Sequence, residues 1–279
     1  MSTVIRPKEN FPTNAEPGGK GILDYLRPFA VNTVGAKLLV AVTGLMLTGF
    51  VIAHLVGNLN VFAGQDAINN YALFLKKLGP LLWLARIGLL VVFLVHVLLV
   101  IKLKSMSAAA RPIAYLHGRT VQASAAGRYM LLTGLVVLAF LLFHLAHFTF
   151  GWVKGADVGG YRVNYLDLRD SSNAVEGGRH DVYSMVVYGF QNTVITVLYV
   201  VAQLALFLHL SHGFQSAFQT LGANSPRWQQ TWRRLGYAVA LLLLVGNVGI
   251  AGAIWAGALQ PTPDITNTLA AAGLEKATP

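Results

Sequence analysis

Five long apolar stretches, separated by polar connections, dominate the pattern of hydrophobic and polar positions along this chain of 279 residues. A helix needs roughly 20 apolar residues to cross a hydrocarbon core of about 30 Å, and each stretch reaches that length. Strands are excluded because unpaired backbone groups cannot face lipid. The pattern therefore predicts an all-α membrane protein, a bundle of five transmembrane helices. The predicted spans are approximately Leu38–Phe62, Pro80–Ile101, Tyr129–Trp152, Tyr183–Leu210 and Gly236–Leu259.

The regions outside these stretches are short. Residues 1–34 are rich in Pro, Gly and charge and contain no apolar core of signal-peptide length, so we expect a cytoplasmic N-terminal arm. Residues 35–260 form the transmembrane domain, in which no internal repeat is evident. Residues 261–279 predict a short tail on the outer side, without a domain of its own. In the last span, small residues at a spacing of three predict close helix packing: Gly246, Gly249 and Gly252.

Positive charge is concentrated on one face of the predicted bundle. The chain up to Lys37, the connection from Lys102 to Arg128 and that from Ser211 to Leu235 carry five, five and three Lys or Arg residues, against three acidic ones. This face therefore accounts for the whole net charge of +10, and the opposite face balances to zero. The positive-inside rule then predicts a multi-pass protein of the cell inner (cytoplasmic) membrane, with its N-terminus cytoplasmic and its C-terminus outside.

Composition supports this class and excludes several kinds of site. The chain is 55% hydrophobic and 11% charged, and its mean hydropathy is +0.57, far from an ordinary soluble domain. It has no cysteine, which excludes disulfides, thiolate metal sites, iron–sulfur ligation and covalently attached c-type haem within this chain. Because sidedness explains the net charge, no nucleic-acid partner is expected.

Four of the eight histidines lie inside four different predicted helices: His54, His96, His144 and His209. Ionisable side chains at such depth are uncommon and usually functional; the alternative is a neutral imidazole bonded to a neighbouring carbonyl group. A rise of about 1.5 Å per residue places His54 and His144 at one depth, roughly 23 Å from the cytoplasmic helix ends. His96 and His209 share another depth, within roughly 2 to 8 Å of the cytoplasmic side.

Two histidines that face each other at one depth form a bis-imidazole clamp for a flat macrocycle. Two such clamps predict two b-type haems stacked between the first four helices. A dinuclear metal site would need carboxylates at the same depth, and a proton relay would need them between the two depths. Because the predicted helices contain no Asp or Glu, haem explains these residues best.

Several segments also resemble a known family. They are AHLVGNLNVF around His54, FLVHVLLVIK around His96, TGLVVLAFLLFHLAHFTFG around His144, YSMVVYGFQN, and LHLSHGFQSAFQTLG around His209. In order and spacing they resemble the single-chain, di-haem cytochrome b membrane-anchor subunit of succinate dehydrogenase and fumarate reductase, over nearly the whole membrane part.

The resemblance implies one axial ligand from each of the first four helices. His54 and His144 would bind the outer haem, and His96 and His209 the haem on the cytoplasmic side. The family pattern selects His144, and not the neighbouring His147, because the ligand lies twelve residues into the stretch that begins with Thr133. The last helix carries no ligand in the family and no histidine here.

The resemblance also implies partners. They are a flavoprotein subunit that interconverts succinate and fumarate and an iron–sulfur subunit that exchanges electrons with the nearer haem. The chain itself would carry no dehydrogenase chemistry and would pass electrons through the haems to a membrane quinone, menaquinone or ubiquinone. The basic face fits a docking surface, or alternatively an interaction with anionic lipid alone. A higher oligomer of the complex is compatible with the sequence.

The remaining candidate residues are less specific. A quinone needs only an apolar slot and one or two polar groups, and the turn GQDAINNYALFLKK supplies Asp66, Asn69 and Tyr71 near the outer haem level; a solvated amphipathic helix is the alternative. Arg119 and Arg128 are candidates for propionate contacts, although the positive-inside rule also explains them. The segment from Lys154 to Asp181 is long and mixed in charge, and we expect it to cap the outer end.

Two other functions remain open from the residues. One is a di-haem cytochrome b of another quinone-linked oxidoreductase, which the copurifying subunits would distinguish. The other is a transporter whose intramembrane histidines bind protons or metal, which haem content would distinguish.

Overall fold

The computed structural model describes residues 32–110, 125–172 and 176–274, which are mostly helical. Five of its helices are long and apolar enough to span a membrane, which confirms a multi-pass membrane protein. These spans comprise α2 (Thr33–Asn58) with its 3-10 extension (Leu59–Ala63), α4 (Pro80–Ala109), α6 (Met130–His144) with a π-helical turn (Leu145–Thr149), α8 (Thr193–Thr220) and α9 (Pro226–Trp255).

The fourth span differs from its predicted bounds. The sequence predicts one helix from Tyr183 to Leu210, whereas the structure has a short helix α7 (Val182–Gln191) followed by α8. The two meet at Asn192, whose backbone is extended and whose side chain accepts a hydrogen bond from the Ile195 amide at 3.2 Å. An N-cap of this kind starts a new helix. Hydropathy missed the break because both helices are apolar.

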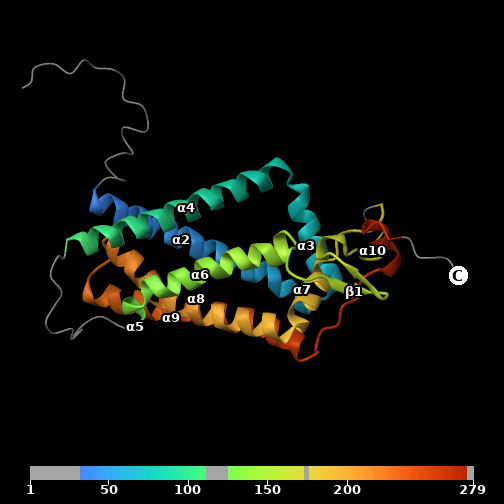
Figure 1. Cartoon of the computed structure of the whole chain (residues 1–279). Coiled ribbons are helices and arrows are strands. Elements are labelled where there is room, and N and C mark those ends of the chain that lie inside the picture. Colours follow the sequence, from blue (N-terminus) through green and yellow to red (C-terminus); the bar gives the residue numbers. More distant parts are fainter. Residues whose placement is uncertain (1–31, 111–124, 173–175, 275–279) are drawn as a thin grey trace, which may run out of the picture.

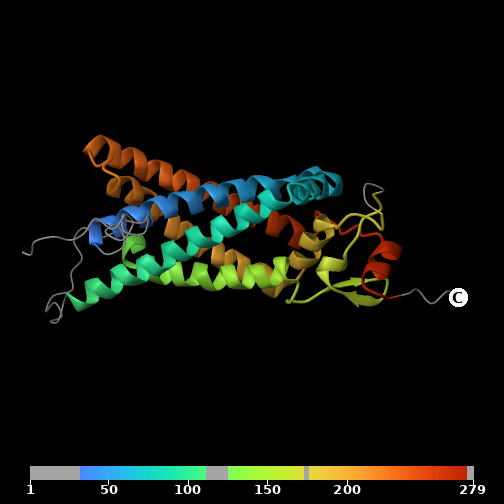
Figure 2. The same ribbon diagram turned by 90° about the horizontal axis from the view of Figure 1, so that it is seen from above.

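Figures 1 and 2 show that the five spans run side by side along an elongated bundle. Helix α2 packs against α4, α6 against α8, and α8 against both α2 and α9. One end, the basic end, holds the start of α2, the end of α4, the short helix α5 (Ala125–Arg128) and the start of α9. The described charged side chains there are all basic: Lys37, Lys102, Lys104, Arg128, Arg227, Arg233 and Arg234.

The opposite end, the capped end, is covered by a small folded layer. It contains α3 (Gln65–Lys77), α7, a hairpin of β1 (Ala156–Val158) and β2 (Tyr161–Val163), a 3-10 turn (Tyr165–Asp167) and α10 (Ile265–Ala271). The hairpin is antiparallel and turns through Gly159 and Gly160, both at positive φ, as a tight two-residue turn requires. The described residues between Lys154 and Asp181 therefore cap one end of the bundle, as predicted, and that this end is the outer one stays a prediction.

The described residues after Gln260, up to Leu274, pack on the cap and include α10. The Asp264 amide donates to the Arg169 carbonyl at 2.7 Å, and α10 buries Thr268 and Leu269 against the hairpin layer. The sequence did not predict this helix because Pro261 and Pro263 interrupt the apolar pattern just before it begins.

The close helix packing predicted from the glycine spacing in α9 is found at one of the three glycines. A side chain at Gly246 would meet Leu55 of α2 at 2.7 Å, so this glycine allows the two helices to approach closely. At Gly249 and Gly252 the described structure places nothing within 4 Å of an added Cβ atom. Helix α4, all of which is described, buries no residue, as expected for a helix that faces lipid.

Candidate functional site

The four predicted histidines come together in two pairs. The imidazole rings of His54, on α2, and His144, at the end of α6, have centroids 5.8 Å apart and planes at 89°. Two imidazoles that bind one metal from opposite sides, each with a bond of roughly 2.0–2.1 Å as for zinc, have centroids about 6 Å apart. The separation therefore fits two imidazoles that hold one metal ion between them.

The second pair is His96 on α4 and His209 on α8, which lie within electrostatic range of each other. Each is the seventeenth residue of its helix, so both lie near the middle of helices that run in the same direction. The sequence placed them close to the cytoplasmic ends of their helices, and that was wrong, because α4 continues to Ala109 and α8 to Thr220. We name them the central pair, and His54 with His144 the capped-end pair.

His96 is held by a threonine of the neighbouring helix. The Thr43 hydroxyl lies 3.1 Å from His96 Nδ1 and donates its own proton to the Leu39 carbonyl at 2.6 Å. With that proton committed, the hydroxyl can only accept, so Nδ1 carries a hydrogen and donates it to Thr43. The Nε2 atom of His96 is then unprotonated, which is the form that binds a metal.

His209 has the same arrangement on the other side of the bundle. The Thr133 hydroxyl lies 3.4 Å from His209 Nδ1 and shares its one proton between the carbonyls of Tyr129 and Met130, both at 3.1 Å. His209 Nδ1–H therefore donates to Thr133, and its Nε2 atom is also free to bind a metal.

A glycine beside each threonine makes room for the imidazole. A Cβ atom at Gly44 would lie 3.1 Å from His96 Cε1, and one at Gly134 would lie 3.2 Å from His209 Cε1. Both contacts are tighter than ordinary van der Waals distance, so even alanine would push the ring aside. The Thr-Gly pair on each helix thus forms a matched cradle for a histidine of the next helix.

These cradles belong to an internal repeat that the sequence reading missed. Thr43–Leu55 and Thr133–Leu145 share the pattern T-G-L, four residues, F, three residues, H-L. Each copy contains a cradle and, eleven residues later, a histidine of the capped-end pair. Eleven residues of helix span about 16 Å, which separates the levels of the two pairs along the bundle. A comparison of the two spans for a shared pattern would have found it.

The capped-end pair has aromatic surroundings instead of a cradle. Phe50 stacks on His54 with ring centroids 5.6 Å apart, and Phe140, at the equivalent place in the repeat, lies 5.9 Å from His144. The Tyr199 hydroxyl of α8 lies 3.2 Å from His144 Nδ1 and 3.0 Å from His147 Nδ1. His147 is fully buried.

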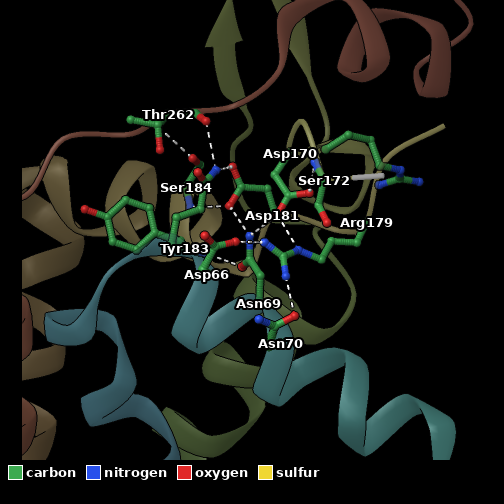
Figure 3. A network of polar contacts seen from close by, with 12 residues as sticks. Asp66, Asn69, Asn70, Asp170, Ser172, Arg179, Asp181, Tyr183, Ser184 and Thr262 are labelled. Carbon is green, nitrogen blue, oxygen red and sulfur yellow. Dashed lines mark hydrogen bonds and ion pairs between the residues drawn. The ribbon is translucent and has the colours of Figure 1, made fainter. Parts of the chain in front are cut away.

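The candidate quinone residues lie at the capped end, where Figure 3 shows Asp66 and Asn69 in a polar network around Arg179. The Arg179 guanidinium pairs with Asp66 and with Asp170, the latter through Nε at 2.5 Å. Burial opposes its charge, but hydrogen bonds to Asp170 and Asp66 outweigh this and raise the pKa of Arg179. The sequence reading gave Arg179 no role of its own.

Asn69 is part of the cap. Its amide donates to Asp170 at 2.9 Å and to Asp181 at 3.0 Å, and its oxygen accepts from the Tyr183 amide at 3.0 Å. Both donors are therefore used within the protein. The same Asp181 carboxylate caps α7 by accepting from the Ser184 amide at 3.0 Å, so the network joins α3 to α7.

Asp66 and Tyr71 remain accessible. The Asp66 side chain is 87% exposed although it is paired with Arg179. The Tyr71 ring lies over Gly57, where an added Cβ atom would meet it at 2.7 Å, and Gly57 follows His54 by three residues. Tyr71 is thus close to the capped-end pair, and Asp66 lies one and a half turns earlier on α3.

Positive charges lie around two further titratable groups of the capped end, His180 and Lys76. Burial, helped by the positive charge of Lys76, lowers the pKa of His180 to about 4. Burial also lowers the pKa of Lys76, helped by the charges of Arg169 and Arg86. His180 is therefore neutral at pH 7, and its Nε2 atom lies 3.2 Å from the Tyr165 carbonyl, to which it donates.

The two arginines proposed for propionate contacts lie at the basic end. Arg128 ends α5, just before α6. Arg119 lies outside the described residues. Arg128 precedes Thr133 by five residues, so the arginine lies on the basic side of the central pair.

Comparisons of the chain with protein-family models, with curated proteins and with solved structures found no match. Among the described residues there is no group of three or more His, Cys, Asp or Glu side chains that would hold a metal ion by themselves. The fold and the site therefore define a class, a multi-pass helical membrane protein with two pairs of histidines on four of its helices.

Proposed function

We propose that this chain is a di-haem cytochrome b, in which His54 and His144 bind one haem and His96 and His209 bind the other. The observation that carries the proposal is the repeated cradle, which holds Nδ1 of each central histidine and leaves Nε2 free for a metal. A neutral imidazole that only satisfied a carbonyl group would need neither the threonine nor the adjacent glycine. The 5.8 Å separation of the capped-end rings supports the same reading.

When bound, the two haems supply one-electron carriers at two levels of the bundle. The chain's own residues fix the positions of the axial ligands. Thr43 and Thr133 hold the orientation and tautomer of the central pair, and Phe50 and Phe140 pack beside the capped-end pair. The levels, about 16 Å apart, favour electron transfer along the bundle axis.

Within this class, we propose the membrane-anchor subunit of succinate dehydrogenase or fumarate reductase. The sequence resemblance over the first four spans supports this assignment. The basic end offers a docking surface for an iron–sulfur subunit, which would in turn bind the flavoprotein subunit. On this proposal the basic end faces the cytoplasm and the capped end lies outside. The central haem is then the one nearer to the partners.

For the quinone, we propose a site beside Tyr71 and Asp66 at the capped end. Tyr71 supplies an aromatic surface and a hydroxyl. Its ring contacts Gly57, which lies three residues after His54. Asp66 supplies an exposed carboxylate that can exchange protons with a bound quinol. Asn69 is not available as a donor because both its N–H groups serve the cap.

The experiment that tests the haem proposal is a reduced-minus-oxidised spectrum with a pyridine haemochrome assay on the purified complex. We expect two b-type haems per chain and bis-histidine spectra. A protein without haem would refute the proposal and favour a transporter. Identification of the copurifying subunits tests the narrower assignment, because partners other than a flavoprotein and an iron–sulfur protein of the succinate type would indicate another quinone-linked oxidoreductase.

The quinone proposal is tested by turnover in sealed proteoliposomes with and without an uncoupler. Charge that crosses the membrane is worth roughly 2.3 kcal/mol per elementary charge per 100 mV, so a site at the capped end makes the rate depend on the potential. Asp66→Asn should also slow turnover, whereas Asp157→Asn, on an exposed strand residue of the same end, should not. Unchanged rates in both comparisons would place the quinone at the basic end.

A further inference from the structure

The hydroxyl of Tyr199, on α8, lies between the imidazoles of His144 and His147, at the end of the third span. It is 3.2 Å from Nδ1 of His144 and 3.0 Å from Nδ1 of His147. Tyr199 is 6% exposed and His147 is fully buried, so water does not compete for these bonds. A phenol has one proton and therefore donates to only one of the two nitrogens, and the other nitrogen must donate to it.

Ligation of His144 leaves one arrangement of protons. If His144 binds metal through Nε2, its Nδ1 carries a hydrogen and donates to the Tyr199 oxygen. Tyr199 then donates to His147 Nδ1, and the proton of neutral His147 lies on Nε2. We propose that Tyr199 and His147 form a hydrogen-bonded relay that positions the axial ligand His144 and tunes the potential of the capped-end haem. The inference rests on the proposed function, because it requires His144 to be a ligand.

Local packing brings His147 into this relay. The α-helix of α6 ends at His144 and continues as a π-helical turn through Thr149, a feature that is frequent at functional sites. Phe148 packs on His147 with ring centroids 4.0 Å apart. Gly189 of α7 makes room for both rings, because a Cβ atom there would meet Phe148 at 2.8 Å and His147 Cε1 at 3.1 Å.

The relay distinguishes His144 from the central histidines. The threonine hydroxyls donate to carbonyls of their own helix, whereas Tyr199 donates to a second imidazole. Hydrogen bonds in a chain polarise one another, so donation to His147 makes the tyrosine oxygen a better acceptor. A better acceptor at Nδ1–H makes the ligand more basic, which favours ferric iron and lowers the potential.

The ring contact with His54 favours His144 over His147 as the ligand. His144 faces His54 at 5.8 Å, whereas Nε2 of His147 is buried and has no hydrogen-bond partner among the described residues. His147 packs instead against Phe148 and Tyr165, on the side of the cap. His147 therefore acts on His144 through the Tyr199 hydroxyl.

The first test is Tyr199→Phe in the whole complex, with Tyr188→Phe as a control, because the Tyr188 hydroxyl donates to the Asp157 carbonyl in the cap. Redox titration and low-spin haem spectra of the variant should show two haems. The potential of the capped-end haem should rise while that of the central haem stays the same. Unchanged potentials and spectra would overturn the inference, and a wild-type protein without haem would instead refute the proposed function.

The second test is His147→Leu, alone and combined with Tyr199→Phe. His147→Leu keeps Tyr199 but removes its proton acceptor, so we expect a smaller rise in the same potential. That rise should vanish in the Tyr199→Phe background, because His147 acts through Tyr199. Additive shifts would overturn the relay. If Tyr199→Phe loses the haem altogether, a rise in His147→Leu alone supports the inference, and no rise overturns it.

Discussion

Both histidine pairs depend on the same repeated sequence in α2 and α6, yet the protein surrounds them differently. The central pair comes from α4 and α8 and rests on Thr-Gly cradles of α2 and α6. The capped-end pair comes from α2 and α6 themselves and lies among aromatic side chains, with Tyr199 and His147 behind His144. On the proposed function, one repeat therefore supplies the ligands of one level and the ligand supports of the other.

The two surroundings represent two ways to fix the hydrogen-bond acceptor at Nδ1–H of a histidine that would bind metal. A threonine hydroxyl that donates to a carbonyl of its own helix is a fixed acceptor. A tyrosine hydroxyl that donates to a second histidine is an acceptor whose strength depends on that histidine. On the proposed function, the two haems would thus have potentials that single substitutions can change independently.

The largest effect should come from the ligands. His54→Ala or His144→Ala should remove the capped-end haem and leave the central one in part, because each substitution deletes an iron bond and a wall of the pocket. His96→Ala or His209→Ala should do the converse. Haem stoichiometry of the purified complex measures this, with His212→Ala as the matched control on α8. Retention of two haems with unchanged spectra in His54→Ala would show that its assignment is wrong.

The next effect concerns the cap, which adjoins only one of the two levels. Arg179→Gln leaves the buried Asp170 carboxylate without its charged partner, a change that typically costs 3–5 kcal/mol. Thermal unfolding should therefore begin at lower temperature, with release of the capped-end haem before the central one. Asp66→Asn removes the exposed partner of the same arginine and should cost at most about 1 kcal/mol. Equal losses in both variants would contradict the structure.

A smaller effect should follow from filling the cradles. Gly44→Ala and Gly134→Ala place a methyl group at 3.1 and 3.2 Å from the central histidines, so the central haem should bind more weakly while the capped-end haem is retained. Gly49→Ala is the control, because it lies on α2 with nothing within 4 Å of the added atom. All three substitutions gain helix propensity of roughly 1 kcal/mol. A loss shared by the control would therefore rule out the cradle as the cause.

The smallest effect is a change of potential without loss of haem. Thr43→Val and Thr133→Val keep the shape of the side chain but remove the acceptor for Nδ1–H of the central histidines. The potential of the central haem should rise and that of the capped-end haem should not, which redox titration resolves. Thr48→Val removes a hydroxyl whose hydrogen bond, among the described residues, goes to the Gly44 carbonyl at 2.8 Å, and it should change neither potential. A rise at the capped-end haem would show that the two levels are not independent.

Hydropathy and residue type were sufficient for the main features of the fold. The five spans could be predicted because lipid requires long apolar helices, and the length and composition of each stretch alone show whether it meets that requirement. The four histidines could be singled out because a polar side chain in such a stretch is costly wherever it points. The lopsided distribution of Lys and Arg between the two ends is likewise a property of the sequence.

Other features depended on tertiary structure. The ends of the helices, and with them the central position of His96 and His209, follow from caps such as Asn192 and from polar turns that remain helical beyond the apolar run. Hydropathy measures preference for a solvent and cannot locate these ends. The order of α10 and the burial of Arg179 likewise depend on contacts between segments about a hundred residues apart.

The partners of the histidines were decided only when the helices packed. Thr43 and His96 are 53 positions apart, and His147 and Tyr199 are 52 apart. Whether such side chains meet depends on how each helix is rotated about its axis and on how closely glycines let neighbours approach. Neither quantity is encoded in any single stretch. The sequence thus determined which side chains must be satisfied inside the membrane, and the packing of the helices determined which groups satisfy them.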